Sequence, residues 1–240
     1  MGTLPLANTQ DASDWQIRAY DLPFPEGASV ELRKSIASTP QPDVARRQAR
    51  EPKNLQGWKD AISTRAKDNL VGISQVENAF DVVIKESKVS GVRVYEVTPK
   101  QIAPSHANHI MLYVHGGAYV FGAGTASLYE ASVIASTSRL KVLSVDYRMP
   151  PEDPFPQAIE DAVAVYRFLL KSYEPSEVAF GGTSAGGGLA LATTHRLKAL
   201  DVALPGAIYA GTPWADLSKT GDTLFTNEGL DRVLVSYEGL

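Results

Sequence analysis

The fold of this chain is decided by the stretch Val178-Ala179-Phe180-Gly181-Gly182-Thr183-Ser184-Ala185-Gly186-Gly187-Gly188. Its apolar start predicts a short buried strand, its glycines predict a cramped turn, and a helix is predicted over residues 189–200. The glycines are needed because a Cβ in such a turn would clash with nearby backbone. The central five residues fit G-x-S-x-G, the turn that lifts a serine hydroxyl above a sheet.

Ser184 is therefore predicted to be a nucleophile. The N-terminus of the following helix carries unpaired N–H groups and a partial positive charge, which favour the anion formed when the hydroxyl attacks a carbonyl. A plain glycine turn is the alternative interpretation. The strand before the motif and the helix after it favour the nucleophile, because the motif requires both.

Composition limits the classes of function. A chain of 240 residues can bury a sizeable core, and its net charge of −4 gives no basic excess, so we expect no nucleic-acid partner. Without cysteine there is no disulfide framework and no thiolate metal site. Residues 1–16 lack the apolar centre of a signal peptide, and no apolar run is long enough to span a membrane. We expect a cytoplasmic protein without a membrane partner.

Residues 1–75 differ from the rest of the chain in composition and sequence pattern. Scattered prolines separate three short polar stretches predicted as helices, Val30–Ala37, Val44–Glu51 and Leu55–Ala66. Their apolar faces are thin, so each helix must rest on something else. We predict that residues 1–75 form an N-terminal helical cap and that residues 76–240 form the core domain. A loosely packed extension without function is the alternative.

The core domain is predicted to have an α/β fold. Alternating apolar residues indicate a β-hairpin with strands Asp81–Glu86 and Val92–Val97, joined across Lys88–Gly91. Apolar strands and helices then alternate, which predicts a mostly parallel sheet covered by helices on both faces. The predicted elements are strand Ile110–Val114, helix Thr125–Ser138, strand Leu140–Val145, helix Ile159–Lys171, strand Glu177–Phe180, helix Leu189–Leu200 and strand Gly206–Ala210.

A second glycine-rich loop follows strand Ile110–Val114 and reads His115-Gly116-Gly117-Ala118-Tyr119-Val120-Phe121-Gly122. Ligands of parallel sheets gather at the carboxyl ends of the strands, where this loop and Ser184 both lie. Glycines there leave backbone N–H groups free to approach a ligand, as an oxyanion hole requires. A plain turn or a phosphate cradle are the alternatives, and the lack of G-K-[ST] argues against the phosphate cradle.

With both loops placed, the chain from about Phe80 onwards resembles the α/β-hydrolases, specifically the bacterial hormone-sensitive-lipase-like branch of esterases and lactone hydrolases. The resemblance rests on four motifs in order: His115-Gly116-Gly117, the segment Asp146–Pro156, the elbow Gly182–Gly187, and Pro213–Leu217. It implies hydrolysis of small apolar esters or lactones through an acyl-enzyme, without metal or cofactor. It also implies that the N-terminal helices are that branch's cap.

The resemblance carries roles over to individual residues. Ser184 is the implied nucleophile, and the N–H groups of Ala185, Gly117 and Ala118 are the implied oxyanion hole, with Gly116 shaping the loop. Ala118 stands where a third glycine is commoner, and its methyl group narrows the pocket. Thr183 stands where aspartate is more frequent, which we interpret as a change in local hydrogen bonding.

The remaining motif residues receive mainly structural interpretations. Asp146–Pro156 is expected to fix the turn into the next helix. Trp214 and Asp216 are expected to support the loop after strand Gly206–Ala210. Residues 119–121 could line an acyl pocket, although aromatic residues in an apolar run are more often core.

The base that Ser184 needs is not evident in the sequence. In this fold the order is serine, then an acid, then histidine. His195 lies too far along the helix, and His106 and His109 lie at the opposite edge of the sheet. His115 lies at the correct edge, but the resemblance implies that it braces the oxyanion loop; a secondary catalytic role is the alternative.

Asp201, Asp216, Asp222 and Asp231 all precede the strand on which the family places its acid. We therefore expect the acid and base beyond Leu240, and we expect strand Gly206–Ala210 to be an unpaired edge. An inactive ligand-binding protein on the same scaffold and a non-functional fragment are the alternatives.

Overall fold

The computed structural model describes residues 23–40, 43, 45, 49, 51–218 and 220–223. The chain forms two compact units, Met1–Pro42 and Asp43–Leu240. In the first unit, helix α1 (Val30–Ser38) starts at Ser29, whose hydroxyl accepts a hydrogen bond from the N–H of Leu32, and none of its side chains is buried. The predicted helix Val44–Glu51 lies largely outside the described residues, and the division into a cap and a core stays a prediction.

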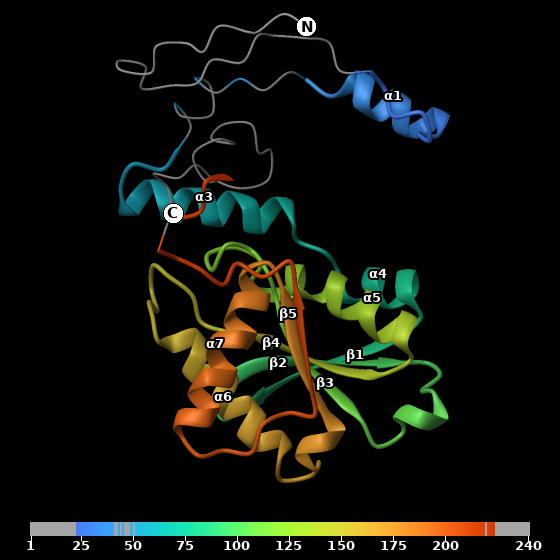
Figure 1. The fold of residues 1–240 in the computed structure, drawn as a ribbon, viewed down its shortest axis with the longest axis vertical. Coiled ribbons are helices and arrows are strands. Elements are labelled where there is room, and N and C mark those ends of the chain that lie inside the picture. The colour runs from blue at the N-terminus through green and yellow to red at the C-terminus, as the bar shows by residue number, and fades with distance from the viewer. Residues whose placement is uncertain are drawn as a thin grey trace, which may run out of the picture. The chain divides into compact units, whose positions relative to one another are not determined.

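The second unit is built on one six-stranded sheet (Figure 1), in the order β1-β2-β4-β3-β5-β6. The strands are β1 (Val82–Val89), β2 (Val92–Pro99), β3 (Ile110–Val114), β4 (Lys141–Asp146), β5 (Val178–Thr183) and β6 (Ala207–Gly211). Strands β4, β3, β5 and β6 pair in parallel, while β1 and β2 extend the sheet in antiparallel fashion. The predicted mostly parallel α/β sheet is confirmed.

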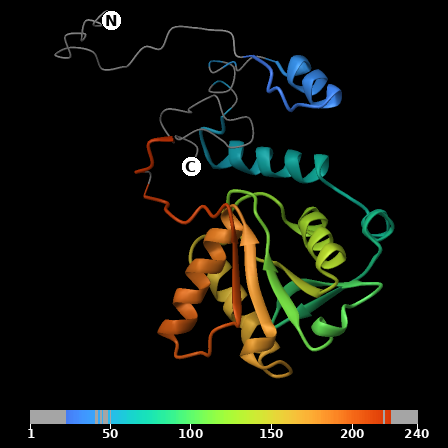
Figure 2. The same ribbon diagram turned by 45° about the vertical axis from the view of Figure 1, so that its right-hand side comes forward.

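Helices cover both faces of this sheet. On one face, α4 (Ile73–Phe80) and α5 (Leu128–Ser138) pack on a core that includes Met111 of β3. On the other face, α6 (Gln157–Leu169) and α7 (Ala185–Ala199) pack on a core that includes Leu112. Figure 2 shows α5 on one side of the sheet and α7 on the other. Successive residues of β3 face opposite layers, as a strand buried on both faces requires.

Several predicted boundaries were wrong. Helix α4 was not predicted, although Ile73, Val76 and Phe80 lie on one helical face, and it ends at Asp81 in a left-handed conformation (φ 55°). The hairpin strands are longer than predicted, and their turn is two residues, Ser90 and Gly91, both with positive φ. The first turn of the predicted helix Thr125–Ser138 is a 3₁₀ helix over Gly124–Ser127.

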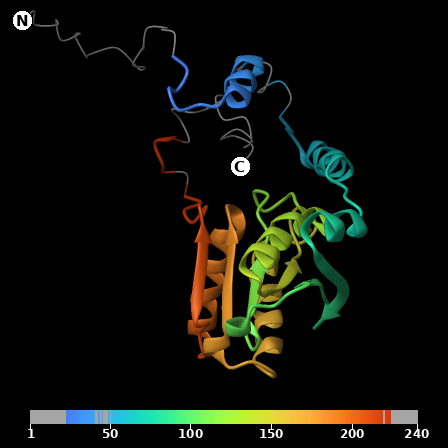
Figure 3. The same ribbon diagram turned by 90° about the vertical axis from the view of Figure 1, so that its right-hand side faces the viewer.

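Helix α7 also begins earlier than predicted, directly after Ser184 rather than at Leu189. Its glycines have low helix propensity, but close packing against β3 and β6 overrides that preference. Helix α3 (Leu55–Asp68) starts at Asn54, whose side-chain oxygen accepts a hydrogen bond from the N–H of Gly57 at 2.9 Å. Figure 3 shows α3 and α4 as consecutive helices leading into β1.

The order of strands places the two glycine loops side by side. Strand β3 pairs with β5 in a register that matches Val114 with Gly182, so His115 and Ser184 leave the sheet at the same edge. Strand β6 is the last strand of the sheet within the described residues, and its Ile208 and Tyr209 are 44% and 46% exposed. None of the described helices is long and apolar enough to cross a membrane.

Candidate active site

Ser184 occupies a strained turn between β5 and α7. Its backbone has φ 58° and ψ −123°, a conformation that costs a non-glycine residue roughly 1–3 kcal/mol. Three backbone hydrogen bonds hold the residue there: its N–H donates to the carbonyl of Gly211 at 2.8 Å, and its carbonyl accepts from the N–H groups of Trp214 at 2.9 Å and Gly188 at 3.1 Å. The side chain is half-buried. The geometry is that of the predicted elbow.

Glycines around the elbow allow backbone segments to touch directly. A Cβ added to Gly182 would lie 2.2 Å from the carbonyl oxygen of Val114, and one added to Gly186 would lie 2.1 Å from the same atom. Both distances are far below van der Waals contact. Strands β3 and β5 and the start of α7 therefore meet at a separation that only glycine permits.

The loop after β3 turns tightly over the same edge. Gly117 has φ 119°, and its carbonyl accepts hydrogen bonds from the N–H groups of Val120 and Phe121 at 3.1 and 2.8 Å. Ala118 and Tyr119 follow with φ values of 52° and 60°. Among the described residues, no protein group accepts a hydrogen bond from the N–H of Gly117 or Ala118. These two donors are available to a ligand.

The elbow and this loop are in direct contact. A Cβ added to Gly116 would lie 3.4 Å from the Cβ of Ser184 and 2.9 Å from the carbonyl oxygen of Thr183. Gly116 therefore lies against the serine. The oxyanion hole of Gly117, Ala118 and Ala185, with Gly116 shaping the loop, stays a prediction.

His115 braces the loop from beneath. It is 3% exposed, its Nδ1–H donates to the carbonyl of Gly116 at 2.6 Å, and its ring stacks on Tyr147 with centroids 4.3 Å apart. The Tyr147 hydroxyl in turn donates to the carbonyl of His115 at 2.7 Å. Burial lowers the pKa of the His115 imidazole, which keeps the ring neutral near pH 7. These contacts agree with the bracing role expected for His115.

Asp146 anchors the other end of the loop. Its Oδ1 accepts from the N–H of Gly124 at 2.9 Å, and its Oδ2 accepts from Nε of Arg93 on β2 at 2.5 Å. Two residues on, the guanidinium of Arg148 forms an ion pair with Asp161 of α6 at 2.6 Å. These contacts agree with the structural role predicted for the segment Asp146–Pro156.

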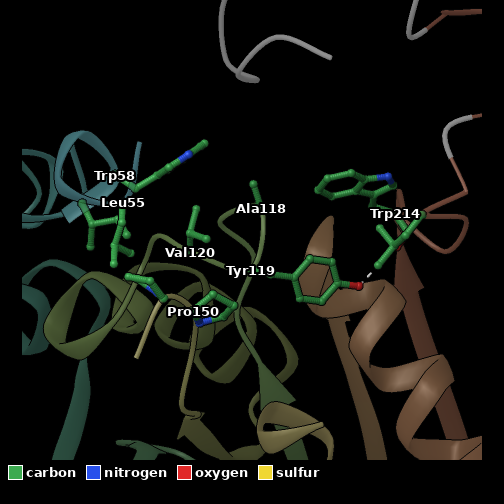
Figure 4. A pocket seen from close by; sticks show the side chains of 10 residues that line it. Leu55, Trp58, Ala118, Tyr119, Val120, Pro150 and Trp214 are labelled. Atoms are coloured by element: carbon green, nitrogen blue, oxygen red, sulfur yellow. Dashed lines mark hydrogen bonds between the residues drawn. The ribbon is translucent and has the colours of Figure 1, made fainter. Parts of the chain in front are cut away.

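An apolar cavity of about 320 Å³ opens beside the elbow (Figure 4). Ala118 and Trp214, which belong to the loops in contact with Ser184, form part of its wall, and α3 contributes a second part. The lining residues are Leu55, Trp58, Ile62, Ala118, Tyr119, Val120, Pro150, Pro151, Trp214 and Leu217. The cavity suits a small apolar group.

The sequence identified some of these lining residues and missed others. Tyr119 and Val120 line the cavity, which is the possibility that the sequence raised. Phe121 instead lines a second cavity, and the Arg65 guanidinium lies over its ring, with Cζ 5.0 Å from the ring centroid. Trp214 supports the loop as predicted, through its N–H, and its side chain also lines the cavity. Trp58 was missed because nothing local in α3 reveals which distant loop it faces.

The other candidate side chains serve elsewhere. His195 is exposed on α7, and the ring of His106 contacts the carbonyl of Ser138. Asp216 accepts hydrogen bonds from the hydroxyl and N–H of Ser218, which lower its pKa. Asp231 lies outside the described residues. Within the described ranges, no cluster of His, Asp and Glu could hold a metal ion.

Comparison with known proteins agrees with this geometry. A family model described as the alpha/beta hydrolase fold matches residues 111–238, which is more than half of the chain. An acetyl-hydrolase of Streptomyces hygroscopicus is 37% identical over 145 residues, covering 60% of this chain and 48% of that protein. An esterase of Acinetobacter venetianus is 32% identical over 160 residues, covering 66% and 51%.

Solved structures give the same result. The crystal structure of one esterase matches with a TM-score of 0.84 at 39% identity, covering 93% of this chain and 68% of that chain. An esterase from the bacterial hormone-sensitive lipase family matches with a TM-score of 0.62 at 29% identity, covering 86% and 63%. The chain spans about half the length of the curated relatives that it matches. By sequence and by structure, the chain belongs to the α/β-hydrolase fold family.

Proposed function

We propose that the protein hydrolyses carboxylic esters or lactones of small apolar substrates, with Ser184 as the nucleophile. One observation carries the proposal: a half-buried serine in a strained turn lies against a loop with two free N–H groups. The names of the matched relatives, an acetyl-hydrolase and esterases, support the same reaction class.

The proposed reaction has two halves. The Ser184 Oγ attacks the substrate carbonyl carbon and gives its proton to a base, while the carbonyl oxygen becomes an anion that accepts hydrogen bonds from Gly117, Ala118 and Ala185. Collapse of this intermediate breaks the bond to the alcohol oxygen, which takes the proton back from the base, and leaves an acyl-enzyme; the alcohol departs from an ester but stays attached to the acyl group of a lactone. Water then attacks the acyl carbon and gives a proton to the base, which returns it to Ser184 Oγ as the acid is released. Within the described residues, no hydrogen bond joins the Ser184 hydroxyl to a histidine.

The cavity supports a limit on the size and polarity of the substrate. Its volume of about 320 Å³ and its apolar lining fit a short acyl or alcohol group, and it offers few polar partners to a charged one. The methyl group of Ala118 occupies space that a glycine at this position would leave open. A short ester or a small lactone ring meets these limits equally.

The test compares Ser184→Ala with the wild type in the protein with its complete natural sequence. With p-nitrophenyl acetate or butyrate as substrate, we expect kcat/KM to fall by at least about 10³-fold, because the oxyanion site alone leaves only weak catalysis. A small aryl lactone tests the second substrate class. Ser172→Ala, at an exposed turn, is the matched control and should keep full activity.

Two readouts complete the experiment. The melting temperature should be nearly unchanged in Ser184→Ala, because the hydroxyl contributes little packing, and a chelator should not alter the rate. Equal hydrolysis by Ser184→Ala and the wild type would refute the serine mechanism. Binding of a non-hydrolysed ester analogue without any turnover by the wild type would instead favour the ligand-binding alternative.

A further inference from the structure

We propose that Glu130 is a positioning residue that fixes the elbow through Thr183, and that it excludes a carboxylate from position 183. The inference rests on the proposed function, because it concerns how the same serine is held. It identifies a contact between α5 and the residue immediately before Ser184 that no motif in the sequence reveals.

The contact is a hydrogen bond between two elements far apart in the sequence. The hydroxyl of Thr183, the last residue of β5, donates to Oε1 of Glu130 in the first turn of α5. The Thr183 Oγ1 also lies 3.4 Å from the hydroxyl of Tyr209 on β6. Both Thr183 and Glu130 are half-buried, so water competes weakly for the bond.

The position of Thr183 affects both Ser184 and the oxyanion loop. Ser184 follows it directly, and the carbonyl oxygen of Thr183 lies 2.9 Å from the position that a Cβ would take on Gly116 in the oxyanion loop. A shift of Thr183 would therefore change the distance between nucleophile and oxyanion donors. Displacements of about 1 Å at a reacting centre can cost roughly 100-fold in rate.

The donor and acceptor roles at this contact are fixed by charge. An ionised carboxylate can only accept hydrogen bonds, so Glu130 requires a donor at position 183. Within the described residues no ion pair involves Glu130. Among the described residues, the ionisable groups of other elements that Glu130 influences are Tyr113 on β3 and His115 in the loop, and Tyr209 on β6 lies near its partner Thr183.

None of these neighbours offers Glu130 a positive charge near neutral pH. Burial raises the pKa of Tyr113, and the nearby Glu130 carboxylate raises it further, so Tyr113 stays a neutral phenol. Burial also lowers the pKa of His115. An aspartate at position 183, the residue more frequent in the resembling family, would place a second negative charge against Glu130. The two residues therefore depend on each other.

The test is a set of variants at the two positions in the complete protein. Thr183→Val removes the donor at nearly constant volume, and we expect kcat to fall about tenfold with KM within about twofold. Thr183→Ser and Glu130→Gln keep the hydrogen bond and should each stay within about threefold of wild type. Thr193→Val is the matched control: Thr193 is buried in α7, its hydroxyl has no partner in the described structure, and its loss should not affect kcat.

Two further variants test the effect of charge at position 183. Thr183→Asp should lower kcat about 100-fold and lower the melting temperature at pH 8. The double variant Thr183→Asp/Glu130→Gln should recover most of both losses, because the amide introduced at position 130 can donate to the aspartate. Repulsion raises the folded-state pKa of one carboxyl group above its unfolded value. The loss in Thr183→Asp should therefore be present at high pH and shrink as the pH falls towards 5.

Three results would overturn the proposal: unchanged kcat in Thr183→Val, a Thr183→Asp variant as active and stable as wild type at pH 8, or no recovery in the double variant. Should Thr183→Asp fail to fold, the contrast between Thr183→Val and Thr183→Ser decides the matter. Absence of Ser184-dependent hydrolysis would refute the proposed function alone. The pairing is then judged by melting temperatures, which must show the same recovery in the double variant.

Discussion

Two regions of this molecule meet at the candidate site and are built in opposite ways. The floor consists of the carboxyl ends of β3 and β5 and the first turn of α7, where backbone meets backbone and glycines remove every intervening Cβ. The roof is α3, which has no buried residue and reaches the site only through side chains. The floor is fixed by covalent geometry and close packing, whereas the roof is held by a few adjustable contacts.

The contacts of the roof are individually weak. Lys59 forms an ion pair with Glu152 at 3.1 Å, but both side chains are largely exposed, and such pairs contribute about 0–1 kcal/mol. Trp58 lies 6.5 Å, centroid to centroid, from Phe121 at a tilted angle. From this contrast we infer that the placement of Ser184 does not depend on α3. Under the proposed function, we expect the roof to set which substrates fit and the floor to set how fast they react.

The sharpest test of the floor is Gly186→Ala. The added methyl group would lie 2.1 Å from the carbonyl oxygen of Val114 and 2.7 Å from that of His115, and neither backbone atom can move aside. We expect a loss of stability above about 3 kcal/mol and a fall in kcat/KM of at least about 100-fold. Urea denaturation and ester hydrolysis measure the two effects. A stable, fully active variant would show that the floor is not closely packed.

The sequence predicted the floor well because its signals are local. Two glycine runs, each directly after a short apolar strand, are sufficient to place both loops at one edge of a parallel sheet. Their side-by-side position followed from the resemblance, and the pairing of Val114 with Gly182 is consistent with it. The tight turn at Ser184 was likewise predicted from the motif itself, and its backbone has a positive φ of 58°.

The roof and the lateral supports were not predictable in the same way. Trp58 and Glu130 look like ordinary surface residues of polar helices, and their importance appears only when distant elements meet. Helix α4 was missed because its eight residues run directly into the alternating pattern of β1. Local patterns therefore predict backbone placement, while contacts between residues far apart in sequence require the folded structure.

The roof is tested by Trp58→Ala. The indole lines the cavity but belongs to a helix without buried residues, so its loss should open the cavity and leave the fold intact. We expect KM for a butyrate ester to rise several-fold, with kcat within about twofold, since ground-state and transition-state binding weaken together. Steady-state kinetics separate the two parameters. A fall in kcat with unchanged KM would show that α3 helps to position the reacting atoms.

The smallest effect is expected from Gly57→Ala, the counterpart in the roof of the glycine substitution in the floor. A Cβ at Gly57 would lie 3.4 Å from the Cα of Pro52 and 3.5 Å from Oδ1 of Asn54, both ordinary contacts. Alanine keeps the N–H that Asn54 caps, and it favours the helix over glycine by about 0.5–1 kcal/mol.

The same chemical change should therefore stabilise α3 and leave kcat and KM unaltered. Hydrogen exchange is the suitable measurement, because α3 can open without unfolding the sheet, and a denaturation curve would then not register the gain. Slower exchange of the α3 amides at constant activity would support an independent roof. If Gly57→Ala instead destabilised the whole unit or reduced kcat, the backbone of α3 would have to be packed as closely as that of the floor, and the contrast between the two regions would be wrong.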